Sequence, residues 1–322
     1  MTPIELSSPC YTNEEAARAH LEAIRWPAGK PESCPLCGAV GESRPLNGKS
    51  MGPGWWYCGA CTDKFTVRTG TIYERSHIPL HKWVLAFRLM ASSKKGISSH
   101  QLARTLNITY KSAWFMSHRI REAMSDTDPS PLGGKDKTVE ADETFIGKAE
   151  KASAQWVNGI GWLVDSPKGI SGKMKVLTVV ERGGKARSVK VNSLRADDLR
   201  PHLVTKVDRK SRLVTDEASH YKALGTEFAS HHTVNHSAFE WTRGDVHSNT
   251  VENYFSVFKR GMRGTYQHCS EAHLQRYLHE FDFRYSNRAA LLVDDCERTE
   301  RAIKGAEGKR LQYRQSRKAR VA

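Results

Sequence analysis

Residues 247–261 carry an acid and a base at a spacing that a helix would bring to one edge. Glu252 and Lys259 are seven positions apart, about two helical turns or roughly 10 Å. Asn249 and Glu252 also match a capping box, in which Asn249 is the N-cap and Glu252 reaches back to it. On this segment alone the cap is the commoner explanation. The apolar residues of the predicted helix fall on one stripe: Val251, Tyr254, Phe255 and Phe258.

Two aspartates upstream favour a catalytic explanation instead. Asp142 lies in the alternating segment 139–142, which predicts a strand with one acidic face. Asp216 ends the apolar segment 212–216, typical of a buried strand. Carboxylates therefore recur on two predicted strands and on the helix that follows them, and this recurrence reverses the preference for a simple cap at Glu252.

Four of the seven cysteines have the spacing of metal ligands. Cys34 and Cys37 form one C-x-x-C pair, and Cys58 and Cys61 form a second pair twenty residues later. Two such pairs give a closed, tetrahedral zinc site with four thiolates and no open catalytic position. A redox dithiol and four unrelated cysteines are the alternatives. We expect the hairpin strands of a zinc ribbon beside the second pair, over 55–57 and 65–67.

The composition indicates a globular protein that binds polyanions. The 322 residues are enough for two or three modules, and the net charge of +15 favours nucleic acid as the partner, although a generic basic protein would have the same charge. The chain has no apolar run of membrane-spanning length and no signal peptide at its start, so we expect a cytoplasmic protein. The odd cysteine count in a reducing compartment favours metal ligation over disulfides.

The first third of the chain reads as mostly helical. Residues 12–26 predict a short helix capped by Thr12 or Asn13. Residues 80–124 predict three helices, the last two joined by a short turn at 106–109. This is the helix-turn-helix pattern, and Lys111 and Arg119 on the last helix are candidate DNA contacts. A plain three-helix connector is the alternative. Residues 125–137 predict a linker.

The largest module alternates strands and helices. Residues 149–172 read as a polar insertion, and the Gly-Gly turn at 183–184 predicts a hairpin. The predicted elements give a mixed α/β sheet with acids in the order of a ribonuclease-H-like nuclease core. Strands are expected at 139–142, 175–181, 186–194, 212–216 and 231–236, and helices near 197, at 219–224 and after 247.

Intervals and longer strings together resemble the DDE-type transposases. The two aspartates precede Glu252, 35 residues lie between Asp216 and Glu252, and Lys259 follows by seven. The chain is similar over roughly 15–290 to bacterial insertion-sequence transposases with a zinc ribbon before the catalytic domain. The strings that carry this resemblance are 70–76, 80–83, 139–144, 215–217, 235–237, 247–261 and 277–285.

This chain departs from the family pattern at two peripheral positions. Gly147 is followed by Lys148 where a second glycine is usual, and Gln267 stands where a histidine is usual. In this family another residue, asparagine included, can replace the third acid, which makes Asn249 a rival to Glu252.

The resemblance implies how the site residues act. Phosphodiester hydrolysis and 3′-OH transfer would use two Mg²⁺ or Mn²⁺ ions, with Asp142 bridging them and Asp216 and Glu252 each completing one side. Lys259 would contact phosphate near the scissile bond. Glu140 shares the face of Asp142 and is a candidate supporting group, whereas Glu143 points away. Other candidate DNA contacts are Arg260, Arg263 and Arg284.

The predicted organisation has five parts, and the predicted partners are the element ends and target DNA. A homodimer or larger assembly on DNA is expected, in the bacterial cytoplasm with the nucleoid. Residues 301–322 hold eight Lys or Arg and predict a disordered basic arm. A DNA-binding regulator with an inactive core and a structure-specific nuclease are the rival functions. The expected parts are an N-terminal helix (12–30), a zinc ribbon (31–72), a helix-turn-helix-like region (73–128), a catalytic domain (136–290) and a basic tail (291–322).

Overall fold

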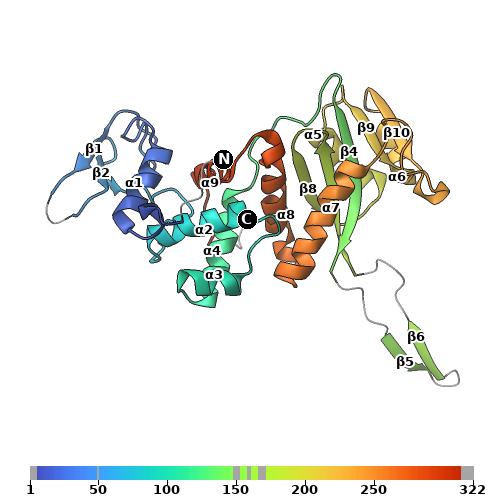
Figure 1. The fold of residues 1–322 in the computed structure, drawn as a ribbon, viewed down its shortest axis with the longest axis horizontal. Coiled ribbons are helices and arrows are strands. Elements are labelled where there is room, and N and C mark those ends of the chain that lie inside the picture. The colour runs from blue at the N-terminus through green and yellow to red at the C-terminus, as the bar shows by residue number, and fades with distance from the viewer. Residues whose placement is uncertain (1–5, 49–50, 148–152, 158–160, 166–171, 313–322) are drawn as a thin grey trace. The chain divides into compact units, whose positions relative to one another are not determined.

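A computed structural model gives the fold (Figure 1). The chain forms two compact units, one made of 1–126 with 287–322 and the other of 127–286. Each unit is described by itself. No helix among the described residues is both long enough and apolar enough to cross a bilayer. The structure describes residues 6–48, 51–147, 153–157, 161–165 and 172–312.

The first unit begins with a helix and a small antiparallel sheet. Helix α1 begins after Asn13, whose side-chain oxygen accepts the N–H groups of Glu15 and Ala16, each at 2.9 Å, which confirms the predicted helix. The strand expected over 55–57 is present, and the one expected at 65–67 ends at Phe65. The elements are η1 (Pro9–Tyr11), α1 (Glu14–Arg25), β1 (Ser43–Leu46), β2 (Trp55–Cys58) and β3 (Lys64–Phe65), with sheet order β1-β2-β3.

Three helices follow at the predicted positions. Ser98 caps the second and Thr109 the third through side-chain oxygens that accept N–H groups, and Asn107 turns the chain between them in the left-handed region. The pattern of two helices joined by a short turn is therefore present, whereas its DNA-binding role remains a prediction. The helices are α2 (Leu80–Ser92), α3 (Ser99–Leu106) and α4 (Tyr110–Ala123).

The structure corrects the expectation of a disordered arm over 301–322. η4 (Ala289–Leu291) is followed by α9 (Asp295–Lys304), which packs against α2. Ala302 and Ile303 are buried, so this amphipathic helix belongs to the core of the first unit. The many basic residues of this segment suggested disorder, although its apolar residues have the spacing of an amphipathic helix. Residues 313–322 lie outside the described part.

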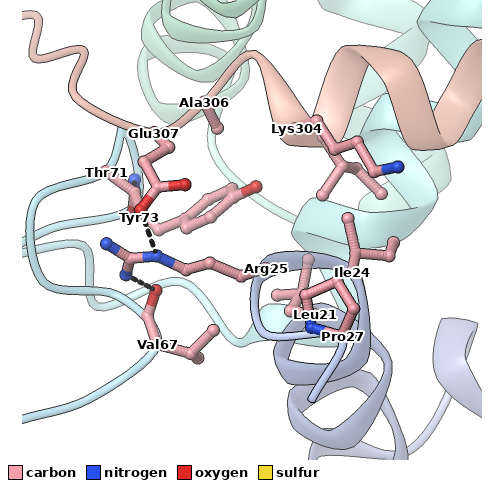
Figure 2. Close-up of a pocket in the computed structure, with 11 residues that line it drawn as sticks. Leu21, Ile24, Arg25, Pro27, Val67, Thr71, Tyr73, Lys304, Ala306 and Glu307 are labelled. Carbon is pink, nitrogen blue, oxygen red and sulfur yellow. Dashed lines mark hydrogen bonds and ion pairs between the residues drawn. The ribbon is translucent and has the colours of Figure 1, made fainter. Parts of the chain in front are cut away.

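A cavity of about 280 Å³ lies in the first unit, between α1, the segment after the ribbon and the end of α9 (Figure 2). Arg25 crosses it: its Nη1 donates to the carbonyl oxygens of Val67 and Thr69, and its Nε lies 3.0 Å from Oε1 of Glu307. These hydrogen bonds tie distant segments together. None of the predicted catalytic acids belongs to this unit.

The second unit is built on a five-stranded sheet with order β10-β9-β4-β7-β8. β4, β7 and β8 form an antiparallel meander, and β9 and β10 run parallel to β4. This order and these directions are those of a ribonuclease-H-like core, which confirms the predicted fold class. The strands are β4 (Thr138–Ile146), β7 (Met174–Glu181), β8 (Ala186–Val191), β9 (Arg212–Asp216) and β10 (Ser230–Val234).

A separate hairpin of β5 (Ser153–Val157) and β6 (Gly161–Asp165) lies within the predicted insertion, part of which is outside the described residues. Helices cover both faces of the large sheet. Val139 and Ala141 pack into the core with α5 and α6, whereas Ile146 packs with α7 and α8. The helices are α5 (Ala196–Lys206), α6 (Ser219–Gly225), η2 (His236–Ala238), α7 (Asn249–Gly261), the π-helical η3 (Met262–Tyr266) and α8 (Glu271–Ser286).

Candidate active site

The sheet places the two aspartates at matching positions on neighbouring strands. Glu140 of β4 pairs with Val214 of β9 in parallel register. Asp142 and Asp216 each lie two residues further along their strands. Because β4 and β9 are adjacent and parallel, the carboxylates of Asp142 and Asp216 lie close together at the carboxyl end of β9.

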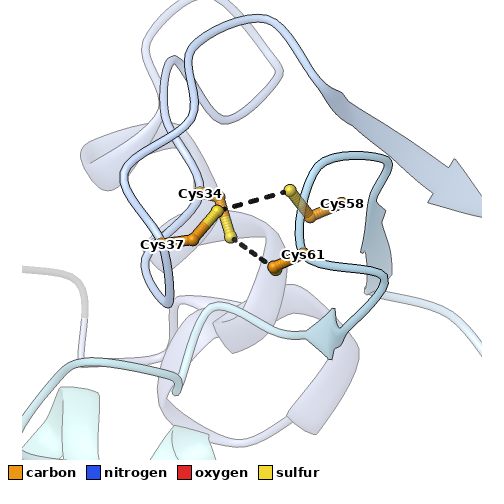
Figure 3. Close-up of side chains that lie close together, drawn as sticks. All are labelled: Cys34, Cys37, Cys58 and Cys61. Carbon is orange, nitrogen blue, oxygen red and sulfur yellow. Dashed lines mark hydrogen bonds between the residues drawn. The ribbon is translucent and has the colours of Figure 1, made fainter.

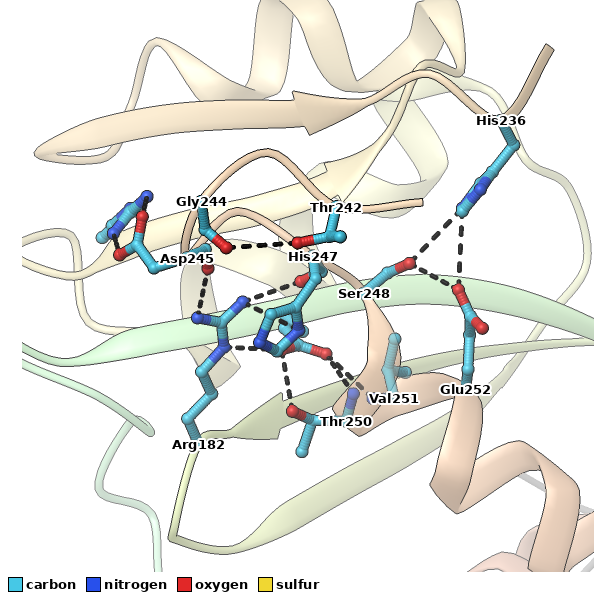
Figure 4. Close-up of polar contacts among 12 residues, drawn as sticks. Arg182, His236, Thr242, Gly244, Asp245, His247, Ser248, Thr250, Val251 and Glu252 are labelled. Carbon is cyan, nitrogen blue, oxygen red and sulfur yellow. Dashed lines mark hydrogen bonds and ion pairs between the residues drawn. The ribbon is translucent and has the colours of Figure 1, made fainter. Parts of the chain in front are cut away.

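A buried carboxylate fixes the start of α7 against β4 (Figure 4). Glu140 has no exposed side-chain surface, and its Oε2 accepts the N–H groups of Thr250 at 2.8 Å and Val251 at 3.0 Å. Its Oε1 accepts from the Thr250 hydroxyl at 2.8 Å and from Arg182 Nε at 2.6 Å. An anion at a helix N-terminus is favourable because the first N–H groups point at it. Glu140 thus supports the site by positioning the helix that carries Glu252.

The predicted capping box between Asn249 and Glu252 is wrong. The N-cap is Ser248, which makes no side-chain hydrogen bond to the helix N–H groups, and Asn249 is the first helical residue. Ser248 Oγ instead donates to Glu252 Oε1 at 2.5 Å. The free N–H groups at the start of α7 donate to Glu140, which lies on β4. Local sequence could not reveal this contact, because the partners are 110 residues apart.

Glu252 lies beside a histidine from the preceding turn. His236 Nε2 is 3.6 Å from Glu252 Oε1, and 45% of the Glu252 side chain is exposed (Figure 4). Among the described residues, Asp142, Asp216 and Glu252 do not form a cluster with all ligand atoms within 4.8 Å of one another. The contact joins residues sixteen positions apart across a turn, so local periodicity does not predict it.

Burial and neighbouring acids dominate the electrostatics of the two aspartates. Burial, followed by repulsion from Glu143 and then from Asp216 and Glu252, raises the pKa of Asp142 to about 8. Burial also raises the pKa of Asp216, with repulsion from Glu143 adding to it. No Lys or Arg in the described part of the chain forms an ion pair with either aspartate. A bound cation would relieve this repulsion.

A second polar cluster lies on the other face of β4. As predicted, Glu143 points away from Asp142, and its Oε1 accepts from His220 Nε2 at 2.9 Å and from the Tyr221 hydroxyl. The hydrogen bond to Glu143 raises the pKa of His220, and the charges of Asp216 and Asp142 add to this. Glu143 lies 77 residues before His220, so no local pattern predicts this cluster.

The basic candidates on and after α7 differ in exposure. Lys259 is half-buried, with its Nζ 5.8 Å from the Phe255 ring centroid, and Arg260 and Arg263 are exposed. Asn249 is exposed at the helix start. Arg284 is 7% exposed and paired with Glu280, so its expected role as a DNA contact is wrong.

In the helix-turn-helix-like region, Lys111 is exposed near the start of α4. Arg119, the other candidate, lies within the first unit. Its guanidinium donates to the carbonyl oxygens of Ile72 at 2.8 Å and Leu311 at 3.2 Å, and its carbon Cζ lies 4.7 Å from the Phe115 ring centroid. Lys111 therefore remains a candidate DNA contact, whereas the guanidinium of Arg119 is bonded within the first unit.

The four predicted zinc ligands converge (Figure 3). The Sγ atoms of Cys34 and Cys61 are 3.8 Å apart, and those of Cys37 and Cys58 are 3.7 Å apart. All four sulfurs lie within 4.8 Å of one another. A tetrahedral zinc with bonds of about 2.3 Å requires sulfur separations of about 3.8 Å, so this cluster fits the ion.

Comparison with known proteins points to one kind of protein. Residues 131–286 match the family described as the ISXO2-like transposase domain, and residues 12–64 match the transposase zinc-ribbon domain. A relative from Halobacterium salinarum, described as an uncharacterized protein in transposable element ISH50, is 26% identical over 288 residues. That alignment covers 85% of this chain and 91% of the relative.

Solved structures found by shape include the Mos1 mariner paired-end complex with Mn, at 12% identity and a TM-score of 0.28, covering 68% of this chain and 74% of that chain. The Mos1 strand transfer complex has 12% identity and a TM-score of 0.22, covering 65% and 77%. Neither superposition is close enough to support a conclusion about this chain. The two family matches show a transposase zinc-ribbon domain over residues 12–64 followed by an ISXO2-like transposase domain over residues 131–286 of this chain.

Proposed function

We propose that this transposase binds the ends of its element, hydrolyses a phosphodiester bond at each end and transfers the freed 3′-OH ends into target DNA. The observation that supports this most strongly is the parallel register of β4 and β9, which brings Asp142 and Asp216 to one end of the sheet. A net charge of +15 suits a DNA substrate.

Asp142, Asp216 and Glu252 would hold the catalytic cations, two Mg²⁺ or Mn²⁺ ions. The donor set fits, because it consists of hard carboxylate oxygens, two of which have raised pKa values and no cationic partner. When bound, such ions activate the attacking oxygen and stabilise the leaving one. Asn249, the rival third ligand, is exposed at the start of α7, one turn before Glu252.

The other residues of the site would position helix α7 and neutralise the charge of the DNA phosphates. Glu140 holds the start of α7, the helix that carries Glu252. Lys259, two turns further along α7, would contact the phosphate beside the scissile bond, where its charge favours the more negative transition state. Arg260 and Arg263, both exposed, would contact the DNA backbone.

We also propose a division of labour along the chain. The ribbon around its zinc and the α3–turn–α4 region, with Lys111 exposed, would recognise the element end, and residues 136–290 would perform catalysis. Because two ends must be held together, the working form would be a homodimer or larger assembly on DNA.

The decisive experiment compares Asp216→Asn with wild type on a duplex carrying the terminal repeat taken from the DNA that flanks this gene. With Mg²⁺ or Mn²⁺, wild type should cleave and join, and Asp216→Asn should lose at least about a hundredfold in cleavage while binding the duplex equally well. Asp197→Asn, which changes an exposed acid at the start of α5, is the matched control.

Equal cleavage by wild type and Asp216→Asn would refute the proposed site. Binding by wild type without cleavage would indicate a regulator with an inactive core. Cleavage that never leads to joined products would indicate a structure-specific nuclease.

A further inference from the structure

Two large aromatic side chains stand in solvent on the turn between β10 and α7. Phe239 is 83% exposed and Trp241 is 60% exposed. The Trp241 ring lies 5.1 Å, centroid to centroid, from the ring of His236, and His236 Nε2 lies 3.6 Å from Glu252 Oε1 (Figure 4). Trp241 is therefore separated from a predicted catalytic acid by one side chain, that of His236.

Hydrogen bonds within the turn keep the pair in place. The side-chain oxygen of Asn235 accepts the Ala238 N–H at 3.1 Å, and its carbonyl oxygen accepts the Glu240 N–H at 3.0 Å. The carbonyl oxygen of His236 accepts the Phe239 N–H at 3.1 Å. The aromatic rings thus project from an ordered backbone.

The turn is also anchored to the end of the strand that carries Asp216. The next residue, Glu217, accepts the N–H of His236 at 3.0 Å and both the N–H and the hydroxyl of Ser237, at 3.1 and 2.6 Å. Glu217 thereby fixes the turn relative to Asp216, and the His236 contact relates it to Glu252. Trp241 is thereby held at the edge of the acidic site, and Phe239 lies two residues before it on the same turn.

Folding gives no reason for these side chains. Neither is buried, and Phe239 has a φ of 56°, in the left-handed region that a bulky residue rarely adopts and that glycine would occupy without strain. Backbone strain of this kind clusters at active sites and at ligand contacts.

We propose that Trp241 is a stacking surface for one nucleobase, unstacked from the duplex beside the scissile phosphodiester, and that Phe239, exposed on the same turn, contributes to it. This inference rests on the proposed function, because the ligand is part of the DNA end that the acids would cleave. A base is the ligand that suits the pair: every base has a flat π-face, and aromatic side chains bind it without regard to sequence. Displacing a base would also make room for the phosphodiester to enter the acidic site.

Permanganate footprinting tests the proposal without requiring cleavage. Full-length protein is mixed with the terminal-repeat duplex in Ca²⁺, with thymines placed on either side of the cleavage position. Wild type should make one of these thymines hyperreactive, because permanganate oxidises unstacked thymine, and the Phe239→Ala/Trp241→Ala double variant should lose that signal. An unreactive duplex with bound wild type would overturn the proposal.

Rescue separates stacking from a structural role. On the fully paired duplex with Mg²⁺, the double variant should cleave about tenfold or more slowly than wild type. Replacing the unstacked nucleotide by an abasic site should restore its rate to within a few-fold, and Trp241→Phe should retain most activity. Trp156→Ala and Leu292→Ala, which remove other exposed apolar side chains, should cleave normally.

Equal losses on paired and abasic duplexes, or a change confined to the oligomeric state, would refute stacking. If wild type binds and opens the base but never cleaves, the proposed catalysis fails and the stacking site stands. If wild type cleaves and the double variant cleaves equally well, only the stacking site fails.

Discussion

Glu252 differs from the two aspartates in its surroundings. Asp142 and Asp216 have raised pKa values and no cationic partner, whereas the Glu252 carboxylate is nearly half exposed and accepts a hydrogen bond from Ser248. Glu252 therefore has a local partner that a cation would have to displace. Substitutions at Glu252 and Asn249 distinguish the two candidates for the third metal ligand.

Glu252→Gln should abolish cleavage, lowering the rate about a hundredfold or more, because an amide oxygen cannot supply the negative charge that a divalent cation prefers. Asn249→Ala should stay within a few-fold of wild type. Single-turnover cleavage in Mg²⁺ measures both. The reverse pattern would place the third ligand at Asn249, one turn earlier.

The raised pKa of Asp142 predicts a pH-dependent stability. Its folded-state pKa of about 8 lies above the ordinary value of 3.8, so the folded state binds more protons between these values. The protonated carboxyl's contribution is fully present below about pH 4 and is lost as the pH rises through about 8. In Mg²⁺-free buffer, the Tm of wild type should therefore fall by a few degrees more than that of Asp142→Asn between pH 7 and 9.

Thermal unfolding monitored by intrinsic fluorescence provides this measurement, and added Mg²⁺ should raise the Tm of wild type but not of Asp142→Asn. Parallel pH curves for the two proteins would contradict the assigned shift.

At the level of elements, helix α7 depends on β4 for its start. A buried carboxylate on the strand replaces the side-chain cap that Ser248 does not provide. The same carboxylate pairs with Arg182 from the turn after β7. One side chain thus joins the strand that carries Asp142 to the helix that carries Glu252.

Glu140→Ala should destabilise the protein by about 3–5 kcal/mol, because it leaves the Nε of the Arg182 guanidinium and two helix N–H groups without their acceptor. Glu140→Gln should lose less stability and still slow cleavage, since α7 would lose its anion. Glu271→Ala is the matched control: it breaks an exposed ion pair with Lys190 and should cost less than about 1 kcal/mol. Urea denaturation checks the stabilities, and a Glu140→Ala protein as stable as the control would refute this role.

The ribbon should depend on its metal, because three short strands bury too little apolar surface to fold alone. Cys58→Ser should reduce bound zinc from one ion per chain to far less and expose residues 31–65 to proteolysis. Cys269→Ser, outside the ribbon, should bind zinc as wild type does. Elemental analysis and limited trypsin digestion give the two readouts. A full zinc content in Cys58→Ser would contradict the four-thiolate site.

On the scale of the whole molecule, a net charge of +15 predicts salt-sensitive DNA binding. Truncation after residue 312 removes Arg314, Arg317, Lys318 and Arg320 but keeps Lys309, whose Nζ donates to the carbonyl oxygen of Ser125 at 2.8 Å. The slope of log K against log salt should become shallower by about 0.9 for each phosphate that the shortened chain no longer neutralises. Fluorescence anisotropy at several salt concentrations measures it, and an unchanged slope would exclude the tail from DNA binding.

The sequence by itself determined the features that depend on near neighbours. The zinc cysteines, the helix over 14–25, the three helices after residue 80 and the strand 212–216 all follow from spacing and periodicity, because the forces that set them act over a few residues. The order of the strands, helices and acids also indicated a ribonuclease-H-like core. What remained a prediction is the use of these residues in catalysis.

Tertiary structure decided the contacts between residues far apart in the chain. Only the pairing of β4 with β9 brings Asp142 beside Asp216, and only the packing of α7 on β4 lets Glu140 bind N–H groups 110 residues away. Tertiary structure also decided the role of Arg284, which was expected to contact DNA and is instead buried in an ion pair with Glu280. A local sequence pattern shows the periodicity of one helix or strand. The contacts of a side chain depend on which elements pack together, and this packing is determined by the burial of apolar surface in the whole core.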